Sequence, residues 1–416
     1  MTNIACNTKY NIQFNQKKSR GSYLFDQKSK QYFLDFFGMY SSLALHYNHN
    51  IFKSDDYIND IVDNSHVKVT NCEFKTSASI DFDNKFTQFC NHKDVFTNFH
   101  YCNTGSLAVE AAIKSALHYK NYHDLCVVTL DNCFHGANSV GMFLTDKFFP
   151  ANKKLNGYPD NYSIKSPPDI QSLRDIFSGN NPTCLLIEPI RCSAGDIYLQ
   201  KDFFKEIRKL CDETNIPLIF DEIQTGFCTT GKKWYFEHLD IIPDIIIFGK
   251  KTQVSGIMCQ EKFAKIFDKE NRTRLDVTFN GDILDMIRSS YIIDAIVQED
   301  LIRNAKMQGD KILKILKKHP DVIINPRGIG LIIAFDCKST LKRDIMIKEM
   351  YENNLLVNKT AKKTIRLRPN LTISDTEVEE FGKILNNMIV KQKKYGCLVT
   401  VDCIMLQVIW QLIFQG

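Results

Sequence analysis

The sequence predicts an α/β protein built around a mostly parallel sheet. Two short apolar runs, PLIF at 217–220 and DIIIF at 244–248, have the length and β-branched content of strands that are buried on both faces. Strand-like runs alternate with an amphipathic helical pattern across residues 125–250, as in consecutive βαβ units. A chain of 416 residues is too long for one small core, so we expect two domains.

The composition excludes several classes of protein. Lys and Arg number 53 against 48 Asp and Glu, and the net charge of +5 is too balanced to indicate a nucleic-acid partner. The 14 cysteines include no C-x-x-C pair, and many lie within apolar runs, so we expect reduced thiols in a cytoplasmic enzyme. The first residues lack a long apolar segment, so we expect no secretory signal.

Each of the two apolar runs leads to a charged group, Asp221 after the first and Lys250 after the second. Ligands of α/β sheets bind at the carboxyl ends of the strands, so the two groups are placed to face one ligand. An amine that captures an aldehyde and an acid that keeps a pyridine ring protonated are the pair that pyridoxal phosphate (PLP) requires. A strand that ends in Asp or Lys is common, so the pair alone would favour a structural role.

The motifs around these two residues resemble those of the class III, fold-type I aminotransferases. The runs IFDEIQTGF at 219–227 and FGKKTQV at 248–254 carry the resemblance, and GKKTQV is most similar to the lysine 6-aminotransferases. The resemblance covers roughly residues 10–392, with its motifs in the family's order. It implies a large domain with a mostly parallel central sheet flanked by helices, and a small α/β domain built from both chain ends.

The resemblance also implies domain boundaries. Residues 1–55 would form the N-terminal part of the small domain, 56–282 the large PLP-binding domain, and 283–394 the C-terminal part of the small domain. The apolar tail at 395–416 has no counterpart in the family. Charged and amide side chains interrupt it, and its longest apolar run is short for a membrane span. We therefore expect an interface strand or a segment foreign to the fold rather than an anchor.

The family frame assigns three residues to the PLP ring. Lys250 would carry the aldehyde as a Schiff base, and Asp221 would pair with the protonated ring nitrogen. Lys251 is the rival of Lys250, but the frame places the reactive lysine directly after the Phe-Gly that ends the strand. Gln224 takes the place of the glutamine that hydrogen-bonds the phenolic oxygen of the ring.

Two further segments would hold the phosphate and the ring face. Residues 99–120 change from a strand-like to a helical pattern at Gly105 and Ser106, and a helix start offers free N–H groups to a phosphate. Thr-Gly-Ser before a helix is usually a simple cap, but its position resembles the family's phosphate-binding turn. Phe134 of the Phe-His-Gly motif takes the place of the aromatic ring that stacks on PLP, although residue type alone favours a core position.

Substrate contacts are assigned in the same way. Arg366 takes the place of the family's carboxylate-binding arginine, and we expect Arg368 to be structural. Glu188 in the EPI motif resembles a glutamate that, in related ω-aminotransferases, pairs with such an arginine and releases it when a dicarboxylate arrives. Lysine 6-aminotransferases carry an arginine after Phe-His-Gly for the substrate's α-carboxylate. This chain has Ala137, which cannot make that bidentate pair.

Thr278 lies in a segment that resembles the one whose threonine reaches the PLP phosphate of the other subunit. The resemblance therefore implies a homodimer with an active site shared across the interface. His46 and His49 have a spacing compatible with metal binding, but no cysteine or acidic cluster accompanies them, so we expect no metal.

The implied reaction moves the terminal amino group of L-lysine to 2-oxoglutarate and gives glutamate and 2-aminoadipate semialdehyde. Because Ala137 replaces the expected arginine, another donor such as ornithine or 4-aminobutyrate remains an alternative. A non-catalytic PLP-fold protein is a third reading, against which the intact Asp221, Gln224, Lys250 and Arg366 argue.

Overall fold

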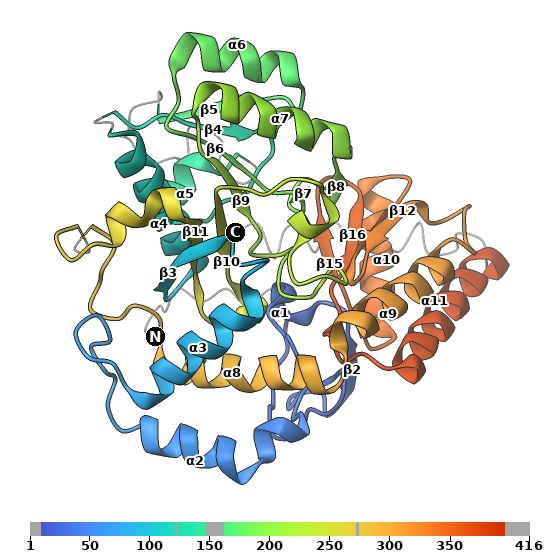
Figure 1. Cartoon of the computed structure of the whole chain (residues 1–416). Coiled ribbons are helices and arrows are strands. Elements are labelled where there is room, and N and C mark those ends of the chain that lie inside the picture. Colours follow the sequence, from blue (N-terminus) through green and yellow to red (C-terminus); the bar gives the residue numbers. More distant parts are fainter. Residues whose placement is uncertain (1–9, 122–123, 147–161, 272–273, 396–416) are drawn as a thin grey trace, which may run out of the picture.

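The computed structural model describes residues 10–121, 124–146, 162–271 and 274–395 (Figure 1). Its centre is a seven-stranded sheet whose strands follow the spatial order β3, β11, β10, β9, β6, β4, β5. The five strands from β10 to β5 in this order run parallel to one another, and β11 is antiparallel to both β10 and β3. The expected mostly parallel sheet is therefore confirmed. The bounds in spatial order are β3 Phe96–Cys102, β11 Ser255–Gln260, β10 Ile245–Phe248, β9 Leu218–Asp221, β6 Cys184–Ile187, β4 Val127–Leu130 and β5 Ser163–Ser166.

Helices cover both faces of this sheet because its central strands are apolar on both sides. Ile219 and Ile247 pack in one core with α4 (Gly105–Lys120) and the 3₁₀ segment Glu261–Phe267. Phe220 and Phe248, the alternate residues of the same strands, pack in the opposite core. That core also holds α3 (Ser77–Cys90), α6 (Ile170–Asn180), α7 (Lys201–Thr214) and α8 (Ile283–Gln298).

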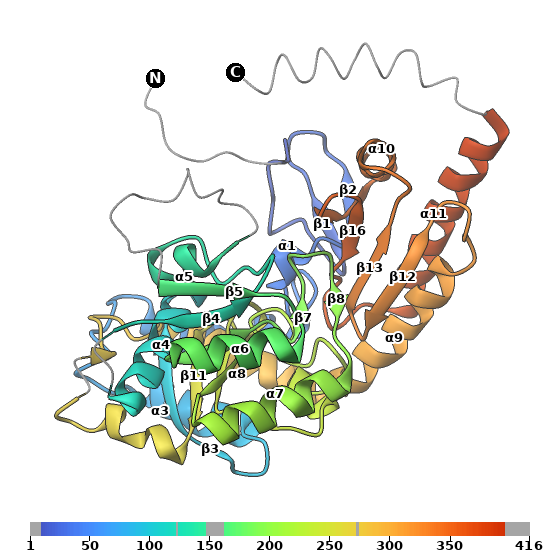
Figure 2. The same ribbon diagram turned by 90° about the horizontal axis from the view of Figure 1, so that it is seen from above.

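A smaller sheet joins the two ends of the chain (Figure 2). Near the N-terminus β1 and β2 form a hairpin, and β14 from the C-terminal third adds to β2 in parallel. A four-stranded sheet follows the order β12, β13, β16, β15 and packs with the C-terminal helices. The bounds are β1 Tyr23–Phe25, β2 Tyr32–Asp35, β14 Leu355–Leu356, β12 Ile324–Ile329, β13 Ile332–Asp336, β16 Thr364–Leu367, β15 Asn358–Thr360, α9 Leu301–Leu316, α10 Thr340–Glu352 and α11 Asp375–Tyr395.

The remaining elements are short or peripheral. They are α1 Gly38–Ser41, α2 Asp55–Asn64, α5 Ser139–Leu144 and the β7–β8 pair, Ile190–Arg191 and Ile197–Tyr198. We keep the boundaries at 55, 282 and 394 as a proposal, although α8, which follows residue 282, packs against α3 beside the large sheet.

Residues 162–182 contain β5 and α6. Three of the four residues in the β5 run SIKS are polar because β5 is an edge strand, so the run lacks the apolar signal of a central strand. Residues 147–161 and the apolar tail after Tyr395 lie outside the described residues. None of the helices in the described ranges combines the length and the apolar character that a membrane span requires.

The packing of α9 on the β12–β13 turn gives a test of the fold. A methyl group on Gly309 would overlap the carbonyl oxygen of Gly330, whereas a methyl group on Gly179 would meet nothing within 4 Å. We predict that Gly309→Ala lowers the free energy of unfolding by about 1–3 kcal/mol, because the backbone must move to relieve the overlap. Gly179→Ala, in α6, is the matched control and should be neutral or stabilise the helix by up to about 1 kcal/mol. Equal denaturation midpoints for both variants would contradict this packing.

Candidate active site

Asp221 and Lys250 follow the predicted strands at the same end of the sheet, where the carboxyl ends of β9 and β10 lie. Strands β9 and β10 are parallel neighbours, and Asp221 is in register with Ile247. Lys250 follows β10 after Gly249 and has a φ of 57°, in the left-handed region that side chains other than glycine rarely adopt. Such backbone strain is concentrated at functional sites, where the surrounding structure holds it in place.

The two neighbouring lysines have different surroundings. Lys251 is buried, and its Nζ donates to the backbone oxygen and the hydroxyl of Ser41, both at 2.9 Å. Lys250 is half-buried, and among the described residues its Nζ makes no hydrogen bond or ion pair. Burial lowers the pKa of Lys250, Asp221 opposes this change, and Arg366 adds to it. A lysine amine with a lowered pKa and no partner has the properties of a reactive nucleophile.

Asp221 is held by a histidine. Its Oδ2 lies 2.8 Å from Nδ1 of the buried His135, and its Oδ1 accepts from the backbone N–H of Ile223 at 3.2 Å. Burial lowers the pKa of His135, but Cys133 and Asp221 outweigh it and raise this pKa to about 10. The protonated imidazole therefore donates a charge-assisted hydrogen bond from Nδ1 to Oδ2 of Asp221. The Phe-His-Gly motif was recognised in the sequence, but its contact with an acid 86 positions away was not predicted.

The turn that begins α4 lies against the Phe-His-Gly loop. Gly105 is the first residue of the helix, and a Cβ on Gly136 would lie 2.5 Å from the hydroxyl oxygen of Ser106. A Cβ on Gly105 would lie 2.8 Å from Cδ1 of Ile223. The structure therefore gathers Gly105, Ser106 and the loop of Phe134 around one place, with Ile223 close by. Ile223 was missed, although its apolar side chain between Glu222 and Gln224 in the motif was a usable signal.

The other predicted cofactor residues differ in position. Gln224 is half-buried next to Ile223, and its Oε1 has no hydrogen-bond partner among the described residues. Phe134 is half-buried on the loop before His135. Thr278 is exposed on the surface of the protomer.

The expected pair between Glu188 and Arg366 is not formed. One carboxylate oxygen of Glu188 accepts from the backbone N–H of Phe134 at 2.7 Å, and the other from that of Cys192 at 3.0 Å. Both oxygens therefore hydrogen-bond to the backbone of two loops, which explains why Glu188 does not pair with Arg366. Arg366 is buried, and its Nε and Nη1 have no partner among the described residues.

Arg368, which we expected to be structural, forms an ion pair. It is buried and its Nη2 lies 2.5 Å from Oδ1 of Asp196. Burial and the positive charge of Arg368 both lower the pKa of Arg366, and Asp196 opposes this change. Arg366 is therefore a buried cation that forms no ion pair with the described residues, and it is suited to bind the carboxylate of a ligand.

The possible metal ligands are otherwise engaged. Nε2 of His49 lies 3.0 Å from Glu299, and Nδ1 of His46 lies 3.0 Å from the backbone oxygen of Tyr47. Within the described ranges no group of three or more His, Cys, Asp or Glu side chains could hold a metal ion.

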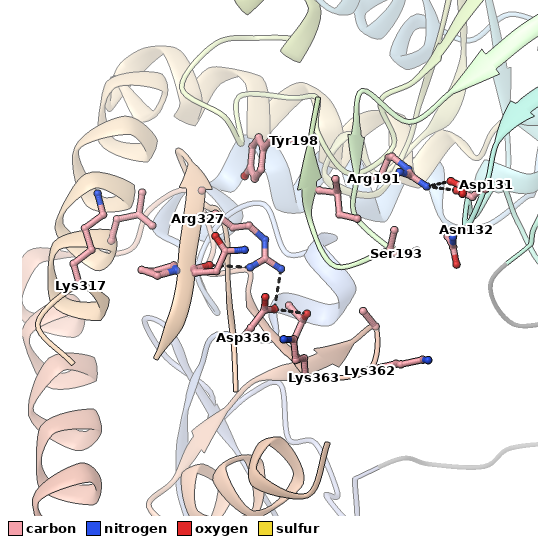
Figure 3. A pocket seen from close by; sticks show the side chains of 18 residues that line it. Asp131, Asn132, Arg191, Ser193, Tyr198, Lys317, Arg327, Asp336, Lys362 and Lys363 are labelled. Atoms are coloured by element: carbon pink, nitrogen blue, oxygen red, sulfur yellow. Dashed lines mark hydrogen bonds and ion pairs between the residues drawn. The ribbon is translucent and has the colours of Figure 1, made fainter. Parts of the chain in front are cut away.

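A cavity of about 1160 Å³ lies elsewhere, between the β7–β8 pair and the four-stranded sheet (Figure 3). Arg327 crosses it to reach Asp336 at 3.1 Å, and Arg191 pairs with Asp131 on its other wall. Because both arginines are neutralised and neither Lys250 nor Asp221 lines it, this cavity is separate from the candidate site.

Comparisons with known proteins cover almost the whole chain. A family model described as aminotransferase class-III matches residues 4–389. The L-lysine-epsilon aminotransferase of Mycobacterium bovis is 29% identical over 397 residues, 87% of this chain and 88% of the relative. The mitochondrial acetylornithine aminotransferase of Debaryomyces hansenii is 27% identical over 396 residues, 90% of this chain and 82% of the relative. The structure of a lysine aminotransferase from M. tuberculosis superposes with a TM-score of 0.86 at 27% identity, covering 92% of this chain and 96% of that chain.

The contrast between the two lysines is testable without any ligand. Lys251→Met removes two hydrogen bonds and leaves the Ser41 oxygens unpaired, so we predict a loss of about 1–3 kcal/mol in the free energy of unfolding. Lys250→Met removes a partly buried cation that has no partner, so the free energy of unfolding should stay the same or increase. Chemical denaturation of the cofactor-free proteins measures both. A larger loss for Lys250→Met than for Lys251→Met would show that the two roles are reversed.

Proposed function

The chain belongs to the class III aminotransferases, and we propose that it uses PLP to transfer the ε-amino group of L-lysine to 2-oxoglutarate, giving glutamate and 2-aminoadipate semialdehyde. The observation that carries this proposal is the placement of an unpartnered Lys250 amine and a His135-bound Asp221 carboxylate at the ends of adjacent parallel strands.

The groups at this place fit PLP. Lys250 offers a free amine for the aldehyde, and Asp221, which is hydrogen-bonded to His135, offers a carboxyl group for the ring nitrogen. The unsatisfied Oε1 of Gln224 marks a polar group that awaits a partner, on the side chain assigned to the phenolic oxygen. The N-terminus of α4 at Gly105 and Ser106 supplies N–H groups for a phosphate. Phe134 and Ile223 provide the apolar surface that a flat ring needs.

Bound PLP supplies an aldehyde that captures amines and a ring that withdraws electrons from the carbon carrying the amine. The Asp221 carboxylate keeps the ring nitrogen protonated, and His135 holds that carboxylate in place. Lys250, whose pKa is lowered, can act first as a nucleophile and then as the base that removes a proton from the substrate carbon. The same amine would give the proton back in a later step of the transfer.

Arg366 would bind a carboxylate of the acceptor. Its Nε and Nη1 are buried without partners among the described residues, and unsatisfied buried donors cost free energy. A carboxylate that pairs with them removes this cost and therefore binds more tightly. Glu188 lies at the same site but holds the loops of Phe134 and Cys192, so we propose that it shapes the pocket rather than releasing Arg366.

L-Lysine as donor is supported by the relatives named L-lysine-epsilon aminotransferase. Ala137, exposed beside the site, favours a second candidate: an aminotransferase that uses ornithine, 4-aminobutyrate or another ω-amine. The acetylornithine aminotransferases among the relatives agree with this alternative. A non-catalytic role is disfavoured, because a protein with no chemistry to perform would have little reason to retain a strained backbone and an unpaired amine at Lys250.

The proposal includes a homodimer and a cytoplasmic location. Thr278, assigned to the phosphate of the partner subunit, is exposed on the single protomer, as a residue of an interface would be. The described cysteines form no disulfide, which agrees with a reducing compartment.

Loss of the Lys250 amine should abolish the chemistry. We predict that Lys250→Met, incubated with PLP, lacks the visible absorption of lysine-bound cofactor and loses activity by at least about three orders of magnitude, because nucleophile and base are removed together. Absorption spectroscopy and glutamate production measure the two effects. Retention of both the colour and the turnover would rule out Lys250.

A panel of amino donors tests the substrate. With 2-oxoglutarate as acceptor, we expect L-lysine to give the highest kcat/KM for glutamate formation among lysine, ornithine, acetylornithine and 4-aminobutyrate. Glutamate formed from ornithine or 4-aminobutyrate but not from lysine would replace the first candidate by the second. A protein that binds PLP and transfers no amino group from any of the four would contradict both.

A further inference from the structure

The short element α1 has a backbone that proteins rarely form. All four of its residues, Gly38–Ser41, have a positive φ, with values of 56°, 49°, 58° and 74° along the chain. The left-handed region normally holds single residues, most often glycine, yet three of these four carry a side chain. Such a conformation persists only where the surrounding structure holds it, and it is typical of functional sites. Residues 38–41, here called the left-handed turn, therefore depend on the contacts around them.

Asp35 holds the start of the left-handed turn. Its Oδ1 accepts from the backbone N–H groups of Phe37 and Gly38, both at 2.8 Å. Its Oδ2 accepts from the hydroxyl of Tyr47 at 2.7 Å. Asp35 is fully buried, so water does not compete for these bonds. The chain therefore enters the turn in one fixed direction.

The loop of Lys250 holds the end of the left-handed turn. Nζ of Lys251 donates to the backbone oxygen and to the hydroxyl of Ser41, both at 2.9 Å. The side-chain amide of Gln253 donates to the backbone oxygens of Ser42 and Lys250, both at 3.1 Å. The backbone N–H of Gln253 also donates to the oxygen of Lys250, at 2.9 Å. The turn is thus bonded to the segment that directly follows Lys250.

The left-handed turn also packs on the backbone that follows β16. A Cβ on Gly38 would overlap the carbonyl oxygen of Arg368, so only glycine allows this approach. The backbone N–H of Arg368 donates to the oxygen of Phe36 at 2.7 Å. Arg366 lies two positions earlier, within β16. The turn therefore connects the backbone that carries Lys250 with the backbone that carries Arg366.

We propose that Lys251 is a positioning residue that, by holding the left-handed turn, fixes the Arg366 guanidinium relative to the Lys250 amine. An acceptor bound to Arg366 through a carboxylate then presents its keto carbon to the cofactor in one position. An error of about 1 Å in such a placement can slow a reaction by about a hundredfold. This role rests on the proposed function, because the spacing matters to the reaction only if Lys250 carries the cofactor and Arg366 binds the acceptor.

The two halves of the proposed reaction depend on this spacing to different degrees. The acceptor 2-oxoglutarate carries a carboxylate directly beside its keto carbon, so an arginine can hold its reacting end. An ω-amine reacts at a terminal carbon that carries no carboxylate. A displacement of Arg366 should therefore slow the acceptor half of the reaction and spare the donor half.

The first experiment measures hydrogen exchange by mass spectrometry in the full-length protein freed of cofactor. We expect Lys251→Met to speed exchange at least about tenfold in peptides that cover residues 36–43 and 364–368, because the turn and the strand end beside it open together. Lys165→Met is the matched control, since Lys165 also donates to a hydroxyl and a backbone oxygen, those of Thr129 and Leu144. It should leave both peptides at the wild-type rate. Unchanged exchange in the turn of Lys251→Met, or faster exchange in the turn alone, would overturn the link to Arg366.

The second experiment uses the PLP-loaded enzyme and follows each half-reaction as a single turnover, whose rate does not depend on the fraction of active protein. With 2-oxoglutarate, Lys251→Met should lower the saturating rate at least about tenfold and keep the half-saturating concentration within about threefold, because the carboxylate still pairs with Arg366. With the amino donor, the rate should stay within about threefold of wild type. Equal slowing of both halves would show that Lys251 has no positioning role.

Gln253→Asn tests the same turn if Lys251→Met does not fold. Asparagine tolerates the φ of 61° at this position, but it is one methylene shorter and cannot bridge the oxygens of Ser42 and Lys250. The acceptor half should again slow more than the donor half, and the opposite order would contradict the proposal. Absence of PLP binding by wild type would instead count against the proposed function and leave hydrogen exchange to decide whether the turn holds Arg366.

Discussion

The hydrogen bond between His135 and Asp221 is the interaction on which the proposed site depends. It joins the loop after β4 to the end of β9 and fixes a carboxylate at the edge of the sheet where the Lys250 backbone is strained. Asp221 is only 6% exposed, and a buried acid needs a hydrogen-bond partner. The imidazole of His135 supplies that partner.

Charge also explains why the two buried arginines differ in their partners. Arg366 and Arg368 are two residues apart on and after β16, both are buried, and their charges repel each other. Asp196 satisfies only Arg368, which leaves Arg366 unpaired among the described residues. A buried unpaired cation lowers stability, and proteins retain such groups where a ligand completes the pair. The site therefore gives up some stability in the empty protein for affinity toward a carboxylate.

The sequence predicted those features that depend on local pattern. Apolar runs located β9 and β10, the Phe-Gly-Lys-Lys frame selected Lys250, and the parallel sheet followed from strand–helix alternation; membership of the class III aminotransferases is confirmed. Long-range contacts were not predicted. The partners of Glu188 are backbone N–H groups, which carry no side-chain signal, and the edge strand β5 is too short and polar to be recognised.

The central claim is that one ring lies between Lys250 and Asp221, and reduction of the PLP-loaded protein with borohydride tests it directly. Reduction fixes the cofactor to the amine that holds it, and peptide mass spectrometry then identifies that residue. The proposed site predicts a single phosphopyridoxyl group on Lys250. A group on Lys251, or on lysines at the protein surface with Lys250 unmodified, would show that the amine and the acid do not share a cofactor.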